Sequence, residues 1–393
     1  MNSFNVVKIQ LSKMREQDTQ VRKEAARLWN RMVKLHRYFR KRKLQWPKES
    51  HFKKHFKGRF KLYSSTVQAI IEKFFSNIDT ARTNRRSGDK KAKYPYHFKG
   101  HFNVLWKEAA IKVKGSTIFL SMGRGRKPLK FHLPEIPEGK VVYAELGFHE
   151  LRLTLKRNVP DVEKRPNIAA ADLGNIHLSV ITDGKKTISV VGRGLRSINQ
   201  KHNKKKAVIS KLLSKCKKGS RRWKKLKRSL GKSSIKKDNQ QRNLLHHAAN
   251  IVTKFCGERD IGELAVGDIT NINKNKKGKT SKRLNQENGS IALGKFVEYL
   301  KYKLKLIGCE VIMINEAYTT RTCPVCGNQH KPAGRTYRCK NCGGIFARDE
   351  VGAVNILNKY INGKIKPGMI IPTNHIKYLR PVKLPTLVGL HGT

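Results

Sequence analysis

Apolar residues recur at helical spacing in several stretches of the chain. Between residues 15 and 40 they fall at every third or fourth position among arginines and lysines, which predicts an amphipathic helix. The same spacing predicts a helix over Tyr63–Ala81, for which Ser64 or Ser65 is the expected N-cap. Further helices are expected in three ranges: a basic helical pair over 196–258, Ala292–Leu306 and Glu350–Asn358.

Short apolar runs bounded by glycine, proline and aspartate predict strands in two regions. Residues 1–13 and 108–157 predict short strands that together form a small β-barrel. In the second region a buried run ends in Asp172 and a glycine turn. The strands expected there are Ile168–Asp172, Leu178–Thr182, Thr187–Val191, Ile261–Ile269 and Glu310–Asn315.

Three stretches have no apolar periodicity. Residues 158–166 are expected to be a linker between the two regions. Residues 273–287 are polar and rich in lysine, which predicts a mobile loop. Residues 361–393 show no clear pattern, so we expect a disordered C-terminal tail.

In the second region, three strands are followed by helices, a strand, a helix, a strand and a helix. This order is typical of the RNase H-like fold, in which the first, fourth and fifth strands lie side by side and parallel. Asp172 lies at the carboxyl end of the first strand, Glu316 lies at that end of the fifth, and Asp349 heads the last helix. Carboxyl ends of parallel strands collect ligands at one edge of a sheet, so we expect these acids to converge on Mg²⁺. Such a site suits phosphodiester hydrolysis.

The end of the fourth strand, the usual place for a middle acid, carries Gly267. Glu263 lies at the wrong end of this strand, and Asp268 should point to the opposite face. Glu316 lies on the neighbouring strand, about 4.8 Å away, and Gly267 leaves room for its longer side chain. We favour Glu316 as the middle acid, with Asp268 and an incomplete site as the alternatives.

Two Cys-x-x-Cys pairs lie between Glu316 and Asp349, and each pair is followed at once by glycine. Their spacing is that of a four-thiolate zinc site in a zinc ribbon, and the glycines allow the tight turns such a site needs. Two redox motifs are the alternative, which the ribbon spacing disfavours. The expected ligands of a structural Zn²⁺ are Cys323, Cys326, Cys339 and Cys342.

The chain of 393 residues is long enough for two or three domains. Its charge indicates which class of partner it binds. Lysine and arginine number 86 against 27 acidic residues, a formal charge of +59, which favours nucleic acid as the partner. A membrane surface is disfavoured because the charge is spread along the whole chain. We expect a cytoplasmic protein associated with the nucleoid, because the chain shows no signal peptide and the remaining cysteines are scattered.

Basic and aromatic residues interleave at 51–57, at 94–99 and in the basic helical pair. Such mixtures can hold phosphates and stack on nucleobases, although core aromatics among solvated lysines give the same pattern. The candidates in the helical pair are Arg221, Arg222, Trp223 and Lys224.

Several segments together resemble the TnpB family, transposon-encoded RNA-guided DNA nucleases related to the compact type V CRISPR effectors. The resemblance covers residues 165–358 well and the N-terminal half only in general layout. The segments that carry it are Asp172–Asn175, Lys217–Leu226, Asn315–Gly327, Arg335–Cys339 and Ala347–Leu357.

The resemblance implies a RuvC nuclease domain in which Asp172 and Asp349 are the first and third acids. A subset of the family resembles this chain in having Gly-Asp at the fourth strand and glutamate in an Asn-Glu-Ala-Tyr motif, which supports Glu316. The implied domains are a wedge-like barrel (1–13 and 108–157), a helical recognition domain (14–107), RuvC (167–318 and 346–360) and a zinc ribbon (319–345).

The family also implies a guide RNA, a target double-stranded DNA and a short motif beside the target, bound by a protein monomer or by a dimer on one RNA. Gln68 and Tyr63, from the helix at 63–81, are the candidate readers of that motif. The expected function is an RNA-guided, Mg²⁺-dependent DNA endonuclease. The alternatives are a nuclease-inactive guided repressor, a type V CRISPR effector and a zinc-ribbon DNA-binding protein without RNA.

Overall fold

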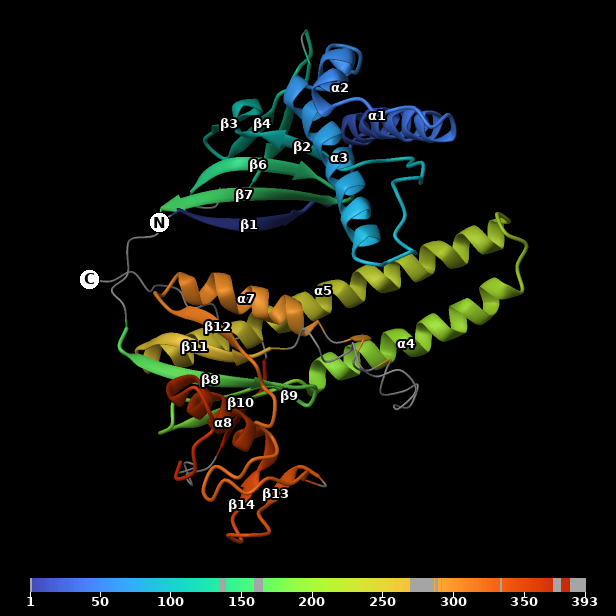
Figure 1. Ribbon diagram of the computed structural model, residues 1–393. Coiled ribbons are helices and arrows are strands. Elements are labelled where there is room, and N and C mark those ends of the chain that lie inside the picture. Colours follow the sequence, from blue (N-terminus) through green and yellow to red (C-terminus); the bar gives the residue numbers. More distant parts are fainter. Residues whose placement is uncertain are drawn as a thin grey trace. The chain divides into compact units, whose positions relative to one another are not determined.

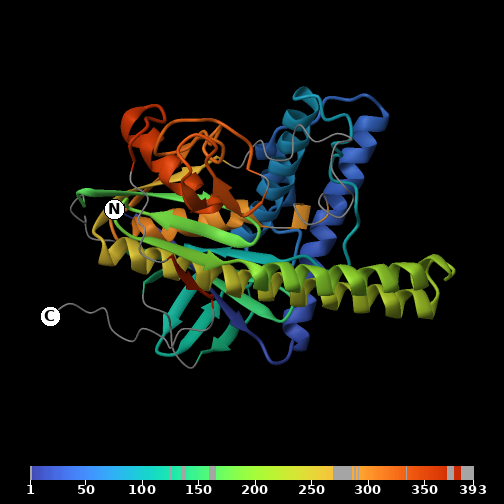
Figure 2. The same ribbon diagram turned by 90° about the horizontal axis from the view of Figure 1, so that it is seen from below.

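A computed structural model of the chain describes residues 2–123, 125–133, 139–158, 165–268, 286, 289–290, 292–332, 334–369 and 376–381. The chain divides into two compact units, Met1–Pro160 and Asp161–Thr393 (Figures 1 and 2). None of the described helices combines the length and the apolar character that crossing a membrane requires. The expected linker and mobile loop lie largely outside the described residues.

The described residues of the first unit form the α-helices α1 (Glu16–Lys41), α2 (Glu49–Phe56) and α3 (Ser64–Arg86). The predicted helices at 15–40 and 63–81 are confirmed, whereas α2 was not predicted because its eight residues are too short to show a clear period. The predicted cap is wrong: α3 starts after Tyr63, without a side-chain hydrogen bond, and Ser64 and Ser65 lie inside the helix.

Stacked aromatic side chains are part of the core of the first unit, together with aliphatic residues from its helices and strands. Trp29 stacks on Phe102 with ring centroids 4.8 Å apart, and Trp46 stacks on Phe52 at 4.6 Å. Within the basic–aromatic stretch 51–57, Phe52 and Phe56 are buried. The aromatic residues of 51–57 are therefore core residues rather than exposed nucleobase contacts. In the stretch 94–99, by contrast, Phe98 is half exposed.

The strands of the first unit form two antiparallel sheets, and their pairing within the described residues does not close the predicted barrel. A short 3-10 helix, Glu108–Ala110, follows β2 directly and leads the chain from the first sheet into the second. The first sheet has the order β1 (Asn2–Gln10), β7 (Glu150–Asn158), β6 (Lys140–Leu146) and β2 (Val104–Lys107). The second contains β3 (Ile111–Lys114), β4 (Thr117–Leu120) and β5 (Leu129–His132).

A six-stranded sheet with the order β12-β11-β8-β9-β10-β15 organises the second unit. As predicted, β11 runs parallel to both β8 and β12. The expectation of a disordered tail from residue 361 is wrong in part, because β15 pairs in parallel with β10. The strands are β8 (Asn167–Leu173), β9 (His177–Thr182), β10 (Thr187–Val191), β11 (Ile261–Gly267), β12 (Glu310–Ile314) and β15 (Lys377–Leu379).

Helices cover both faces of this sheet (Figure 1). On β8, Ala169 and Ala171 pack with residues of α5 and α7, and Ala170 packs with residues of α8. Because side chains alternate along a strand, Asp172 faces α8. The helices are α4 (Arg193–Ser214), α5 (Arg221–Glu258), α7 (Leu293–Lys305) and α8 (Arg348–Asn362). The predicted helical pair is confirmed as α4 and α5, which extend together beyond the sheet (Figures 1 and 2).

Candidate metal centres

The cysteine cluster, formed by Cys323, Cys326, Cys339 and Cys342, brings four sulfur atoms within 4.8 Å of one another. The Sγ atoms of Cys323 and Cys342 lie 3.7 Å apart, and those of Cys326 and Cys339 lie 3.5 Å apart. Four sulfurs placed tetrahedrally around Zn²⁺ at its usual bond length would be about 3.8 Å apart. The cluster therefore fits a zinc ion held by four thiolates.

Backbone turns shape each half of the cluster. Gly327 and Gly343 adopt φ angles of 77° and 70°, a region that favours glycine, as the position of glycine after each pair predicts. A backbone N–H from Asn328 is the main cause that lowers the pKa of Cys326 to about 6, which favours the thiolate that binds metal. The ribbon continues through the hairpin β13 (Thr336–Arg338) and β14 (Ile345–Ala347), which leads directly into α8.

Asp172, at the end of β8, lies in a recess against α8. A Cβ atom at Gly352 of α8 would lie 2.6 Å from Oδ2 of Asp172, so only glycine leaves space for this carboxylate. Burial, followed by the charges of Asp349 and Glu316, raises the pKa of Asp172 well above its ordinary value. The carboxylate of Asp172 thus interacts electrostatically with both of the other predicted acids.

Glu316 reaches back over the end of β11. A Cβ atom at Gly267 would lie 2.5 Å from Oε2 of Glu316, so the space beside Gly267 is filled by this carboxylate as predicted. Burial and then the charge of Asp268 raise the pKa of Glu316. Glu263 lies toward the opposite end of β11 and accepts a hydrogen bond from the Tyr360 hydroxyl at 2.7 Å.

Asp349 lies in the first turn of α8 and is held by two arginines. Nη1 of Arg335, from the ribbon, donates to Oδ2 of Asp349 at 3.0 Å, and Nε of Arg348 lies 3.7 Å from Oδ1. In the part of the chain that the structure describes, only the cysteine cluster brings three or more ligand atoms within 4.8 Å. The acidic edge, formed by Asp172, Glu316 and Asp349, is therefore wider than the first coordination shell of a single ion.

The single helix α8 positions all three acids. It carries Asp349, leaves space for Asp172 at Gly352, and fixes the segment after Glu316 through Asn355. The buried Asn355 amide donates to the carbonyl oxygens of Thr319 and Thr322, both at 2.7 Å. Sequence reasoning missed Arg335, Gly352 and Asn355, although all three lie in segments that carry the family resemblance.

The predicted nucleic-acid contacts belong to both units of the chain. Gln68 is exposed and Tyr63 is half-buried, at the start of α3 in the first unit. In the second unit, Arg221, Arg222 and Lys224 are exposed in the first turn of α5. Beside them Trp223 is half-buried, and Nζ of Lys227 lies 5.6 Å from its ring centroid.

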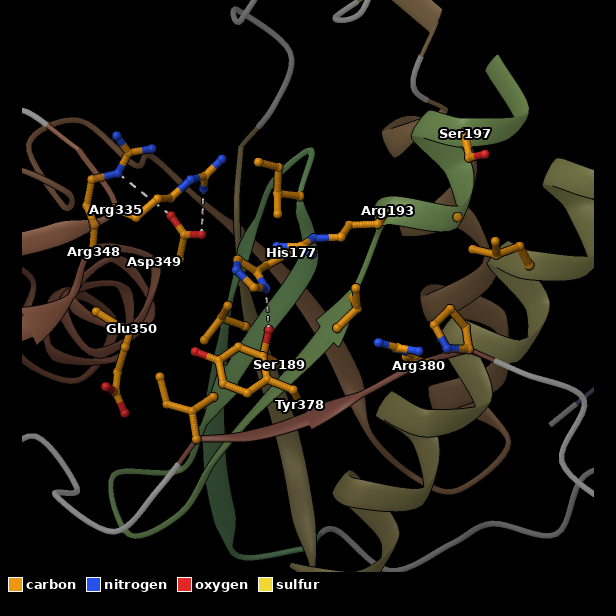
Figure 3. Close-up of a pocket in the computed structure, with 18 residues that line it drawn as sticks. His177, Ser189, Arg193, Ser197, Arg335, Arg348, Asp349, Glu350, Tyr378 and Arg380 are labelled. Carbon is orange, nitrogen blue, oxygen red and sulfur yellow. Dashed lines mark hydrogen bonds and ion pairs between the residues drawn. The ribbon is translucent and has the colours of Figure 1, made fainter. Parts of the chain in front are cut away.

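A cavity of about 960 Å³ opens beside Asp349, and sequence reasoning did not predict it (Figure 3). Its lining comes from β9, β10, the start of α4, the start of α8 and residues 376–381. Asp349, Arg335 and Arg348 lie on one side of it, and His177, Ser189 and Tyr378 lie near its middle. A ligand in this cavity would contact the acidic edge.

Two family models match the chain. The family described as Cas12f1-like, TNB domain, matches residues 294–356, and the family described as Probable transposase matches residues 151–273. These two matches cover the three acids of the acidic edge and the four cysteines of the cysteine cluster.

Curated proteins and a solved structure also resemble the chain. TnpB-like protein MJ0751 of Methanocaldococcus jannaschii is 31% identical over 169 residues, which are 42% of this chain and 57% of that protein. The putative transposase MJ0856.1 of the same organism is 35% identical over 81 residues, 18% of this chain and 74% of that protein. The chain thus spans little more than half of the first relative. A cryo-EM structure titled as a Cas12f1–sgRNA–target DNA complex shares the fold, with a TM-score of 0.59 and 16% identity over 87% of this chain and 82% of that one.

Proposed function

Because the chain belongs to the TnpB family, we propose that it is an RNA-guided DNA endonuclease whose single nuclease site is the acidic edge. The observation that carries this proposal is the position of Glu316. Its carboxylate occupies the space beside Gly267, at the edge of the sheet where Asp172 ends the first strand. Glu316 thus supplies the middle acid from the neighbouring strand, because the usual position for this acid carries Gly267.

The acidic edge offers only carboxylate oxygens, the ligands that Mg²⁺ prefers. Two ions about 3.5–4 Å apart, the spacing of two-metal sites, suit carboxylates that are spread more widely than one coordination shell. When bound, Mg²⁺ would activate water and stabilise the leaving oxygen of the phosphodiester. The chain itself holds the acids in place, through Gly267, Gly352 and the Asn355 hydrogen bonds.

A guide RNA and a target DNA are the proposed partners. A formal charge of +59 needs polyanions to offset its self-repulsion. The solved structure that shares the fold is, by its title, a complex with sgRNA and target DNA. We assign the guide and the target to this chain on that likeness, with base pairing reading the sequence.

The test is cleavage of guide-matched DNA by the purified ribonucleoprotein in Mg²⁺. Glu316→Gln removes the charge of one metal ligand, so we expect cleavage to fall by about 10³-fold with target binding unchanged. The matched control is Glu310→Gln, at an exposed glutamate that begins β12, the strand preceding Glu316. This variant should cleave like the unsubstituted protein. If Asp268→Asn abolishes cleavage while Glu316→Gln retains it, the middle acid is Asp268 instead.

A second candidate function is that of a guided binder without nuclease activity. The pairing of Asp349 with Arg335 and Arg348 favours it, because the third acid is neutralised by arginine rather than turned to the other two. This candidate predicts tight guided binding and no Mg²⁺-dependent nicking under any condition. Cleavage that depends on Asp172 excludes it.

A further inference from the structure

Arg22 of α1 is buried in the first unit without a partner for its charge. Only 7% of this residue is exposed, and its Nε has no hydrogen-bond partner. Among the described residues, the guanidinium group forms neither a hydrogen bond nor an ion pair. Burial lowers the pKa of Arg22 more than the charge of Glu150 raises it. Because a buried cation without a partner is costly, the position favours an anion supplied from outside the chain.

The charged groups around Arg22 do not neutralise it. Glu150 is the acid whose charge acts on Arg22, but its carboxylate already forms two ion pairs, one of them with Lys8. Lys23 and His101 are exposed, and burial followed by the charges of Arg22 and Lys23 lowers the pKa of His101. This excess of cations suits a phosphate, which a guanidinium group binds through two parallel hydrogen bonds.

Phe148 lies beside this guanidinium group, in the turn between β6 and β7. Cζ of Arg22 lies 5.7 Å from the centroid of the Phe148 ring. Of the large apolar side chains that the structure describes, Phe148 is the most exposed, at 65%, so most of its surface is open to a ligand. An exposed aromatic ring beside a phosphate-binding cation is the arrangement on which nucleobases stack.

The turn that carries Phe148 is strained and held from outside. His149, the next residue, has a φ angle of 57°, in the left-handed region where residues other than glycine are uncommon. The backbone N–H of Leu11 donates to the carbonyl oxygen of His149 at 2.9 Å, and the N–H of His149 lies 3.3 Å from Sδ of Met14. Strained residues are frequent at binding sites, where the surrounding contacts keep them in place. The turn therefore presents Phe148 at a fixed position.

We propose that the Arg22 cluster, formed by Arg22, Lys23, His101 and Phe148, binds one nucleotide of a nucleic acid strand. Arg22 binds the phosphate, with Lys23 and His101 as further donors, and the base stacks on Phe148. A formal charge of +59 favours a polyanion as the source of the phosphate. The cluster lies in the first unit and the acidic edge in the second, so its role is to hold a strand rather than to cut it. It rests on the proposed binding of nucleic acid and not on the proposed cleavage.

The first test compares Arg22→Met with Arg31→Met. Both variants remove one positive charge from α1, but Arg31 is exposed. RNA and DNA share phosphates and bases, so affinity for guide RNA is measured with the full chain, and affinity for matched DNA with the ribonucleoprotein in Mg²⁺-free buffer. We expect Arg22→Met to weaken one of these affinities about tenfold more than Arg31→Met does, and the affected one identifies the strand. Arg22→Met should also raise the Tm, because it removes an unpaired buried charge.

The second test concerns the ring. Phe148→Ala should weaken the same affinity about tenfold, and Phe148→Tyr should retain it, because tyrosine preserves the stacking surface. Phe4→Ala is the control, because Phe4 is a second exposed ring of the first unit, and this variant should bind like the unsubstituted protein. Equal affinities of Phe148→Ala and Phe148→Tyr would overturn the stacking of a base on this residue.

Equal affinities of Arg22→Met and Arg31→Met for both RNA and DNA would overturn the site and leave the proposed partners standing. A lower Tm of Arg22→Met would also overturn it, because the guanidinium group would then already be satisfied in the free chain. If the chain binds no nucleic acid, the proposed function fails, and inorganic phosphate tests the site alone. Phosphate should raise the Tm of the unsubstituted protein more than that of Arg22→Met, and equal shifts overturn the site.

Discussion

The cysteine cluster and the acidic edge are both suited to metal, but only the cysteines are gathered at ligand distance. Four sulfurs lie within 4.8 Å of one another, whereas Asp349 is turned to Arg335 and no such group of carboxylates exists among the described residues. Charged carboxylates repel one another: after burial, the charges of Asp349 and Glu316 raise the pKa of Asp172. The four cysteines thus already have the spacing of zinc ligands, and we propose that Mg²⁺ draws the three acids of the acidic edge together.

The two centres also differ in how the chain builds them. The cysteine cluster lies within 20 residues and is formed by local turns such as the Gly327 N–H to Cys323 carbonyl hydrogen bond of 2.9 Å. The acidic edge joins β8, the segment after β12 and the start of α8, so it depends on tertiary packing. Removing a cysteine should therefore disrupt local folding, and altering the acidic edge should disrupt chemistry with the fold retained.

The largest effect is expected from Cys339→Ser. Zinc binding and ribbon folding are coupled, so the variant should lose its zinc and the order of residues 319–345. The ribbon carries Arg335 and leads through β14 into Asp349, so cleavage should fall by more than about 100-fold. Zinc content by elemental analysis and the cleavage rate are the measurements. The control is Cys216→Ser, at a half-buried cysteine outside the ribbon, which should change neither zinc content nor cleavage rate. A full equivalent of zinc in Cys339→Ser would contradict the role of the cysteine cluster as a locally formed zinc site.

An intermediate effect is expected from Gly267→Ala. The new Cβ would lie 2.5 Å from Oε2 of Glu316, so the carboxylate must move and cleavage should fall by about 10–100-fold with zinc content unchanged. Gly231→Ala is the matched control, because a Cβ there meets no atom within 4 Å. A helical alanine should only add about 0.5–1 kcal/mol of stability.

A double variant sharpens this result. Gly267→Asp alone should also reduce cleavage, because it adds a carboxylate where Glu316 already lies. Gly267→Asp combined with Glu316→Ala returns the acid to the end of β11 and should recover part of the lost rate. Equal activity of Gly267→Asp with and without Glu316→Ala would show that these two positions do not share one site.

Strand order and the acids at strand ends could be predicted, because apolar alternation and strand length are local signals. The parallel arrangement of β8, β11 and β12 and the space at Gly267 follow from that order. The contact of Gly352 with Asp172 and the hydrogen bonds of Asn355 could not be predicted in this way, because they depend on the rotation of α8 over the sheet. The strand β15 was missed because three residues show no period.

The smallest effect concerns stability rather than chemistry. The folded-state pKa of Asp172 is raised above its unfolded value of about 3.9, so the folded protein binds this proton more tightly than the unfolded chain. This group therefore favours folding most below about pH 4 and makes the fold less stable as pH rises through the raised pKa. Asp172→Asn removes the charge and should raise the free energy of unfolding at pH 7 by roughly 1–2 kcal/mol in Mg²⁺-free buffer, or a few degrees in Tm.

The decisive control for this last prediction is the dependence on Mg²⁺ and pH. Adding Mg²⁺ at pH 7 should raise the Tm of the unsubstituted protein and leave that of Asp172→Asn nearly unchanged, because only the former has the full set of charges to bind the cation. At pH 4 the two proteins should melt at similar temperatures. Asp79→Asn, an exposed aspartate on α3, should lie within about 0.5 kcal/mol of the unsubstituted protein at either pH. If Asp172→Asn is less stable than the unsubstituted protein in Mg²⁺-free buffer, the buried charge of Asp172 does not destabilise the fold, and the contrast with the cysteine cluster is lost.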